Sequence, residues 1–315
     1  MNSIGDAIVV WLQPEGNSDS VYVSRYDFAV DTWTTPAVVE NLALPASDTR
    51  AVLDDNGNAL VVWVQSDGVQ PSIYAARYYD VLTDWGAPVL LESGDLGRVT
   101  EPHVALSKSG NAVAAWIQSD GIRDDVWAAR FVVASNSWDT AVKLDTGNQS
   151  ASAVRVEMDD VGDAVAVWVQ SDGSVENIYS ADFDSGAGTW GTPVLVDAAT
   201  GAASDPAVSV NASGDAMVAW VQDDGIQPSA YAARKSASAS VWGAPVLLEN
   251  DDITPVRSTR VALADSGDAL SAWVAGTPGG DISSFEGSLA NASYRFAGES
   301  VIPTQGLSVF LDRTT

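Results

Sequence analysis

One tryptophan-bearing segment recurs along the whole chain at a nearly constant spacing. Its clearest copy runs from Gly57 to Gly68 and is almost entirely apolar between Ala59 and Gln65. The steps between successive copies are 52, 53, 52, 52 and 53 residues. The tryptophans that mark the copies are Trp11, Trp63, Trp116, Trp168, Trp220 and Trp273. Self-similarity at one fixed period of this size predicts a repeat architecture built from one supersecondary unit.

Each unit has the pattern of four short strands separated by turn residues. In the second unit the expected strands are residues 50–53, 59–65, 73–78 and 85–91, and Pro88 suits an edge strand. Units of about 50 residues with a tryptophan at a fixed place are typical of β-propeller blades. The sequence therefore predicts an all-β, six-bladed β-propeller with four antiparallel strands per blade. Residues 1–315 would form one domain, with units that start near residues 5, 57, 110, 162, 214 and 267.

The two ends of the chain fall at different places in the repeat. The chain begins with a second strand, Ala7 to Trp11, and ends after a first strand, Leu307 to Leu311. We expect the C-terminal strand to join the N-terminal three, which would close the ring and cover two strand edges. No signal peptide precedes the first unit, so the chain is either cytoplasmic or the mature part of a secreted or surface protein. We favour an extracellular or cell-surface location.

The charge balance is strongly acidic, with 42 Asp and Glu against 15 Lys and Arg and a formal net charge of −27. Such a charge repels nucleic acid and anionic membrane surfaces, because both bind through basic patches. No apolar run approaches the roughly 18 residues of a membrane-spanning helix. The chain has no cysteine, which excludes disulfides, thiolate metal sites and a cysteine nucleophile.

A polar string follows the tryptophan in five of the units. A glutamine comes two residues after the tryptophan, and an acidic residue before a glycine follows it. The acidic candidates for ligand binding are Asp67, Asp120, Asp172 and Asp224. Amide and carboxylate groups on one loop could bind sugar hydroxyls or calcium, or the glutamine could satisfy backbone groups while Asp-Gly forms a turn.

The Asp- and Asn-rich turns between first and second strands are a second place for calcium. Residues 54–58 and 159–163 have this composition but lack the spacing of an EF-hand loop and its closing glutamate. No cofactor is expected, and calcium is a weak alternative.

The expected first strands carry basic residues at equivalent positions. These are Arg50, His103, Arg155 and Arg260. If they face the central channel, three arginines on alternate blades would form a site for an anion or carboxylate, which arginine binds in a bidentate manner. The alternative is that each arginine pairs with a nearby Asp or Glu. His103 is the only histidine, and no Gly-x-Ser-x-Gly motif accompanies it.

Residues 5–11, with Gly-Asp-Ala followed by Trp, and residues 25–33, with Arg-Tyr-Asp followed by Trp, carry a family resemblance. They resemble the units of bacterial secreted and surface β-propellers of the sialidase-like and lectin-like kind. The resemblance covers the whole chain and implies its architecture. Sialidases also carry Ser-x-Asp-x-Gly-x-x-Trp boxes, which Asp182, Asp184 and Trp190 do not match in spacing. Arg50, Arg155 and Arg260 are similar to the three arginines of sialidases, but no tyrosine–glutamate nucleophile pair can be assigned beside them.

Three functions are compatible with this pattern. We expect a non-enzymatic binding or scaffold module that binds a glycan, another surface polymer or a protein, as a monomer or as part of a larger chain. Several equivalent weak sites would then act together through multivalency. The alternatives are a structural or protein-binding propeller of a larger surface protein, and a sialidase-like glycoside hydrolase. A hydrolase predicts two carboxylates roughly 5–10 Å apart in a cleft.

Overall fold

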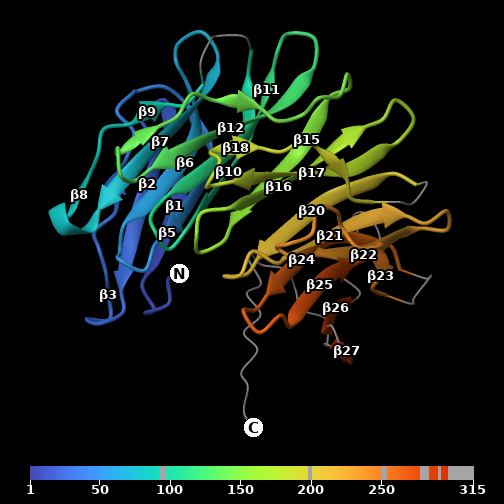
Figure 1. Ribbon diagram of the computed structural model, residues 1–315. Coiled ribbons are helices and arrows are strands. Elements are labelled where there is room, and N and C mark those ends of the chain that lie inside the picture. Colours follow the sequence, from blue (N-terminus) through green and yellow to red (C-terminus); the bar gives the residue numbers. More distant parts are fainter. Residues whose placement is uncertain (93–96, 198–200, 250–253, 277–283, 290–291, 297–315) are drawn as a thin grey trace.

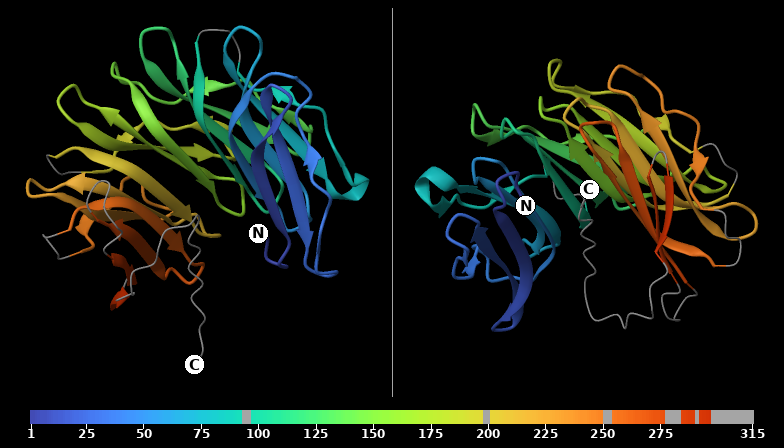
Figure 2. Two further views of the ribbon diagram at one scale, coloured as in Figure 1. Left: turned by 180° about the vertical axis from the view of Figure 1, so that it is seen from behind. Right: turned by 90° about the horizontal axis from the view of Figure 1, so that it is seen from below.

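The computed structural model describes residues 1–92, 97–197, 201–249, 254–276, 284–289 and 292–296. These residues form six antiparallel sheets, here numbered sheet 1 to sheet 6 in chain order (Figure 1). Figure 2 shows that the sheets follow one another around an arc, with sheet 1 and sheet 6 at its two ends. The one helix in the described ranges is the short 3₁₀ helix η1 (Asp80–Leu82). The prediction of an all-β fold is confirmed.

The first three sheets contain β1 to β14. Sheet 1 consists of β1 (Ala7–Glu15), β2 (Ser18–Asp27), β3 (Thr32–Trp33) and β4 (Ala37–Val38). Sheet 2 consists of β5 (Ala46–Leu53), β6 (Ala59–Ser66), β7 (Pro71–Tyr79), β8 (Asp84–Trp85) and β9 (Val89–Leu90). Sheet 3 consists of β10 (Val99–Leu106), β11 (Ala112–Ser119), β12 (Asp124–Val132), β13 (Ser137–Trp138) and β14 (Val142–Lys143).

The other three sheets contain β15 to β27. Sheet 4 consists of β15 (Ala151–Met158), β16 (Ala164–Ser171), β17 (Glu176–Asp184), β18 (Thr189–Trp190) and β19 (Val194–Leu195). Sheet 5 consists of β20 (Ala203–Val210), β21 (Ala216–Asp223), β22 (Pro228–Lys235) and β23 (Val246–Leu247). Sheet 6 consists of β24 (Val256–Leu263), β25 (Ala269–Ala275), β26 (Ser284–Leu289) and β27 (Ala292–Phe296).

The fourth strand of a unit is not continuous, in contrast to the prediction for residues 85–91. In sheet 2, β8 and β9 are two separate two-residue strands, and both pair with β7. Residues 86–88, Gly-Ala-Pro, separate them. The proline has no N–H to donate to a ladder, so pairing with β7 is interrupted and resumes at Val89.

The hydrophobic core lies between the sheets. Each of the five core clusters combines buried side chains from two consecutive sheets, from sheets 1 and 2 through to sheets 5 and 6. The second strands β6 and β11 are buried at seven of their eight positions, because both of their faces are covered. The first strands of consecutive sheets, β5, β10, β15, β20 and β24, also contact one another in that order.

The repeated tryptophan sits at the centre of each sheet-to-sheet interface. The side chains of Trp63, Trp116, Trp168 and Trp220 have no solvent exposure. In four units a tyrosine on the third strand stacks on this indole, with ring centroids 5.9 to 6.4 Å apart. Aromatic pairs of this kind add to the large area that each ring buries.

The glutamine two residues later holds the tryptophan and the incoming chain together. In sheet 5 the Trp220 indole N–H donates to Gln222 Oε1 at 2.9 Å, and Gln222 Nε2 donates to the Gly201 carbonyl at 3.0 Å. Gln222 Nε2 also donates to Asp197 Oδ2. Sheets 2 and 4 repeat this arrangement through Gln65 and Gln170. The glutamine thus satisfies backbone groups of the segment that leads into each first strand.

A second contact joins consecutive sheets through the third strands. The Arg25 guanidinium lies 3.8 Å from the Tyr78 ring centroid, and Arg77 and Arg130 lie over Phe131 and Phe183 in the same manner. Between sheets 4 and 5 the same two positions hold Asp182 and Lys235, which form an ion pair. Here an ion pair takes the place of the contact between an arginine and an aromatic ring. Both residues of the contact differ from those in the other sheets, and the contact is still attractive.

Sheet 1 has no counterpart of the first strands of the other sheets within the described residues. Its β1 is flanked on one side by β2 and has no strand paired to its other edge there. Trp11 is partly exposed, and Val9 and Leu12 are 46% and 37% exposed. The expected closing strand, residues 307–311, lies outside the described residues.

The buried glutamine can be tested against an exposed one at the same place in the repeat. Replacing Gln222 by Leu leaves the Trp220 N–H and the Gly201 carbonyl without this partner, so we expect a loss of about 1–3 kcal/mol in the free energy of unfolding. Gln13→Leu is the matched control, because Gln13 is exposed and surface changes stay within about 0.5 kcal/mol. Urea unfolding of both variants measures the difference, and equal losses would contradict the proposed role of the buried amide.

Candidate functional site

The first strands carry an irregularity that shapes the candidate site. β5, β10, β15 and β20 each shift register after their second residue. The third residue of each strand has a positive φ, between 45° and 55°, although none of the four is glycine. These bulge residues are Asp48, Glu101, Ala153 and Asp205. A bulge bends the strand and redirects its side chains, and it commonly lies beside a functional site.

Arg50 and Arg155 lie two residues after this bulge position, and Arg260 holds the equivalent place on β24, where the register shift falls between Val256 and Ser258. All three arginines make the same local hydrogen bond. Each donates from Nη1 to the carbonyl of the residue before it, at 2.9 Å for Arg50, 2.8 Å for Arg155 and 2.6 Å for Arg260. They come from alternate sheets, namely 2, 4 and 6. The pKa of Arg155 is lowered by burial, and the charges of Arg50 and Arg260 lower it further. The structure therefore brings Arg50 and Arg260 into electrostatic range of Arg155.

Two of the three guanidinium groups have no ion-pair partner within the part of the chain that the structure describes. Arg260 lies 3.4 Å from Asp205, whereas Arg50 and Arg155 have no carboxylate within 4.0 Å there. Glu101 and Asp205 are still close enough to raise the pKa of Arg155. Unpaired arginines are unexpected in a chain with a net charge of −27. They leave donors available to an anionic ligand.

His103 belongs to the same cluster. Burial lowers its pKa to about 4, and the charges of Arg155 and Arg50 contribute in the same direction. Its Nδ1 accepts the Val156 N–H at 3.3 Å. The imidazole is therefore neutral near pH 7, and its proton lies on Nε2, because Nδ1 is used as an acceptor. His103 can donate a hydrogen bond to a ligand from Nε2, but that nitrogen has no lone pair with which to act as a base.

The carboxylates of these strands connect one sheet to the next. Glu101 accepts the backbone N–H of Ala153, and Asp205 accepts that of Thr259. The donating amides lie on the first strand of the following sheet, so these bonds satisfy backbone N–H groups at strand edges. Both carboxylates stay close to the arginines while they do so.

Glu157 is a carboxylate on β15 that sequence reasoning missed. It is partly exposed, and burial raises its pKa to about 7. The equivalent positions on the other first strands hold Val52, Ala105, Ser209 and Ala262. Glu157 differs from the uncharged residues at the equivalent positions of the repeat. This difference is visible in the sequence and could have identified the residue.

The four turn aspartates occupy a different place. Each accepts two backbone N–H groups from the residues two and three positions later, as Asp67 does from Val69 and Gln70. Asp120, Asp172 and Asp224 make the same pair of bonds. These backbone hydrogen bonds lower the pKa of all four. The turn geometry accounts for their recurrence, and ligand binding by them stays a prediction.

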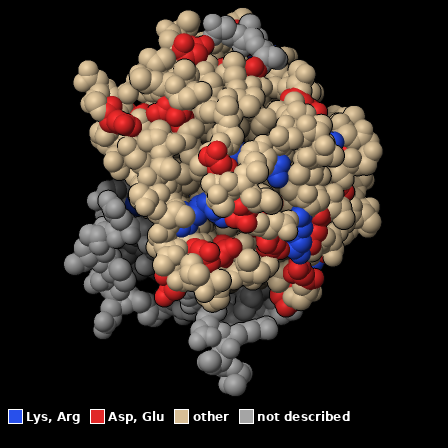
Figure 3. Space-filling model, turned by 90° about the vertical axis from the view of Figure 1, so that its left-hand side faces the viewer, with Lys and Arg blue, Asp and Glu red and all other residues tan. Residues whose placement is uncertain are grey.

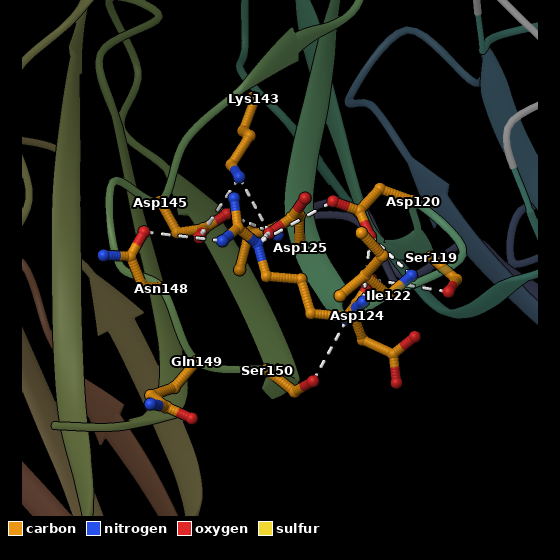
Figure 4. A network of polar contacts seen from close by, with 12 residues as sticks. Ser119, Asp120, Ile122, Asp124, Asp125, Lys143, Asp145, Asn148, Gln149 and Ser150 are labelled. Atoms are coloured by element: carbon orange, nitrogen blue, oxygen red, sulfur yellow. Dashed lines mark hydrogen bonds and ion pairs between the residues drawn. The ribbon is translucent and has the colours of Figure 1, made fainter. Parts of the chain in front are cut away.

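A polar network on sheet 3 was also missed (Figure 4). The buried Asp125 accepts Arg123 Nε at 2.9 Å and Lys143 Nζ at 2.8 Å, and Lys143 also lies 3.7 Å from Asp145. In sheet 2 the equivalent positions hold a glutamine, a serine and a leucine. Three departures from the repeat thus meet in one sheet. Because both cations are paired, the network fixes local structure and offers no free charge.

One face of the described surface also carries charges of both signs (Figure 3). Figure 3 shows acidic side chains spread over one face, with the few basic ones beside them. Within the described residues, no group of three or more His, Cys, Asp or Glu side chains is placed to hold a metal ion. Calcium binding at the acidic turns is not decided by this and stays a prediction. No helix in the described ranges is long and apolar enough to span a membrane.

No protein-family model matches the sequence, and no curated protein is similar to it in sequence. Its fold is similar to that of a polysaccharide lyase described as an ulvan lyase, with a TM-score of 0.56, 9% identity, and coverage of 86% of this chain and 74% of that one. An α-L-arabinofuranosidase of Fusarium graminearum is similar with a TM-score of 0.53, 12% identity, and coverage of 88% and 87%. A sialidase from Streptococcus pneumoniae is similar with a TM-score of 0.50, 9% identity, and coverage of 88% and 64%.

These likenesses support the prediction of a propeller-type fold. They overturn the expectation of a non-enzymatic binding or scaffold module, because the similar folds are those of glycan-processing enzymes. The six units are nearly uniform in sequence and give no sign of one specialised site. This uniformity wrongly favoured a non-enzymatic module. The departures at His103 and Glu157 fall on first strands, which meet only in the folded chain.

The state of His103 can be measured directly, because it is the only histidine. We expect an NMR titration to give a pKa of about 4, and the nitrogen shifts to report the Nε2–H tautomer. Arg155→Ala should raise this pKa, since it removes a nearby positive charge. Arg260→Ala is the control and should change it less, because Arg260 does not contribute to the His103 shift. A midpoint near the ordinary 6.5 in the unaltered protein would contradict the buried cluster.

Proposed function

We propose that the chain is a glycoside hydrolase that acts on an acidic glycan and binds the sugar carboxylate with Arg50, Arg155 and Arg260. The observation that carries the proposal is the convergence of three arginines, two of them without an ion-pair partner among the described residues. Arginine forms bidentate, charge-assisted hydrogen bonds with carboxylates. The rest of the protein is negatively charged and repels extended polyanions. A small cluster of arginines can still bind one carboxylate of a sugar.

The similar structures support the substrate class. One is a sialidase, and sialic acid carries a carboxylate. An ulvan lyase structure with a TM-score of 0.52 is bound to a GlcA(1-4)Rha3S saccharide, which also contains an acidic sugar. Because such glycans are mostly components of surfaces and extracellular polymers, we propose that the protein acts outside the cell or at its surface.

Hydrolysis fits the described residues better than elimination. Elimination from a uronate needs a base that removes a carbon-bound proton, and His103 is held as the Nε2–H tautomer with Nδ1 occupied. Hydrolysis needs carboxyl groups, and the first strands supply Asp48, Glu101, Glu157 and Asp205. Of these, Glu101 and Asp205 are near enough to Arg155 to raise its pKa. If the assay below detects elimination products, the assignment as a hydrolase is replaced by that of a lyase.

For the architecture we propose six blades and a ring closed by residues 307–311 beside β1. The support is the phase of the repeat, since sheet 1 has counterparts of the second, third and fourth strands but not of the first. The exposed apolar side chains of β1, such as Val9 and Leu12, would then be covered. A continuous ring of first strands would also hold the three arginines at fixed separations.

The function is tested by incubating the protein with acidic and neutral oligosaccharides, in calcium and again in chelator. We expect new reducing ends from acidic glycans only, without the ultraviolet absorbance of an unsaturated product. Arg155→Ala should lower kcat/KM by about 10- to 100-fold, the loss of one charge-assisted bond. The control is Arg98→Ala, because Arg98 pairs with Asp124 and is not among the charges that shift the pKa of Arg155 or His103. Unsaturated products would show a lyase, and no cleavage of any acidic glycan would refute the proposal.

Ring closure is tested by removing residues 306–315. The truncated chain should have a lower unfolding midpoint and should aggregate, because β1 would keep an open edge and an uncovered apolar face. A shorter truncation, of residues 313–315, leaves the expected strand complete and should behave like the full chain. Equal midpoints and equal light scattering for the two truncations would rule out the closing strand.

A further inference from the structure

Glu157 is placed on the first strand of sheet 4, two residues after Arg155. No register shift occurs between them, since Arg155, Val156 and Glu157 pair in sequence with Val167, Ala166 and Val165. Side chains two apart on a strand share a face, with about 6.5 Å between their Cα atoms. Val156 and Met158 point into the core between sheets 3 and 4. Arg155 and Glu157 therefore lie on the other face of the strand, which is turned toward sheet 5.

The architecture does not require a carboxyl group at this position. The equivalent residues on the other first strands are valine, alanine, serine and alanine, none of which titrates. Of these, only Ser209 makes a bond to the next sheet, by accepting the Leu263 N–H. Glu157 makes no hydrogen bond or ion pair with any described residue. A partly buried carboxyl group without a partner is destabilising when ionised, so its presence calls for another explanation.

The groups on the elements around β15 leave Glu157 electrically isolated. The strands packed against it are β10, β11, β12, β16 and β20. Their titratable groups are Glu101 and His103 on β10, Asp124, Asp125 and Arg130 on β12, and Asp205 on β20; Arg155 and Glu157 are the ones on β15 itself. None of these charges shifts the pKa of Glu157, which burial alone raises to about 7. Near neutral pH the group therefore holds its proton about half of the time.

We propose that Glu157 is the catalytic proton donor of this site and protonates the glycosidic oxygen of a sugar whose carboxylate is held by the arginine cluster. The assignment rests on the proposed hydrolase function. It places the proton donor on the same strand face as the anion-binding Arg155, with one strand repeat between the two Cα atoms. The other carboxyl groups on the described first strands differ from Glu157, because Glu101 and Asp205 accept backbone N–H groups and Asp48 is exposed.

Hydrolysis of the glycosidic bond at this site needs no reactant other than water. The proton of the Glu157 carboxylic acid moves to the glycosidic oxygen as the bond between that oxygen and the anomeric carbon breaks. The oxygen leaves as the hydroxyl group of the released sugar or aglycone. A water oxygen bonds to the anomeric carbon, and the water proton returns to the Glu157 carboxylate, which restores the acid.

The test compares Glu157→Gln with the unaltered protein on two acidic glycosides that differ only in the leaving group. General acid catalysis contributes about 100- to 10,000-fold, so kcat should fall by that factor for a natural sugar leaving group. It should fall far less for an activated aryl leaving group, which departs without protonation. The alkaline limb of the pH profile of the unaltered protein, centred near pH 7, should be absent in the variant.

Glu157→Ser is the control for folding, because serine is the residue that sheet 5 carries at the same position. This variant should keep the melting temperature and show the same selective loss as the glutamine variant. Equal loss on both leaving groups, or unchanged kcat in both variants, would overturn the role of Glu157 while leaving the hydrolase function in place. If the unaltered protein cleaves neither glycoside nor any acidic glycan, the function fails and the assignment fails with it.

Discussion

The hydrogen bond from the buried tryptophan of sheets 2 to 5 to the glutamine two residues later is the contact on which the rest of the structure depends. A fully buried indole N–H needs a partner, and side chains two apart on a strand share a face. In sheets 2, 4 and 5 the amide nitrogen of this glutamine donates to carbonyls of the segment that leads into the first strand. The glutamine therefore links the tryptophan to that segment. Packing at the sheet interface therefore also fixes where the first strand begins.

The position of the first strands in turn decides the chemistry at their start. Consecutive first strands are close enough for Glu101 and Asp205 to accept backbone N–H groups of the following sheet. They also bring Arg50 and Arg260 near enough to Arg155 to lower its pKa. The repeat explains why these positions are equivalent. It does not explain their differences, since a scaffold would be served equally well by the small residues that other sheets carry there. The titratable residues that break the repeat on the first strands include His103 on sheet 3 and Glu157 on sheet 4.

The contact between third strands shows how such departures can also be neutral. Arg25, Arg77 and Arg130 lie over an aromatic ring of the next sheet, whereas Asp182 pairs with Lys235. Both residues of the contact changed, so its structural role is kept. Glu157 differs from this case because no described neighbour has changed to pair with it. That contrast separates a compensated structural substitution from a candidate catalytic one.

The sequence by itself determined the period, the all-β class and most strand positions, because hydrophobic spacing and turn residues are local properties. It also placed the three arginines at equivalent positions, and it offered the turn role of Asp67 and its counterparts as an alternative. The broken fourth strand could not be located, since Trp85 to Leu91 has the composition of one continuous strand. The tertiary structure was needed to show that Arg50 and Arg155 have no ion-pair partner in the described residues, that His103 is neutral, and that Glu157 shares a strand face with Arg155 although no neighbouring charge shifts its pKa. These are properties of burial and of charges on different sheets, and residues 50 to 260 meet there only after the sheets have packed.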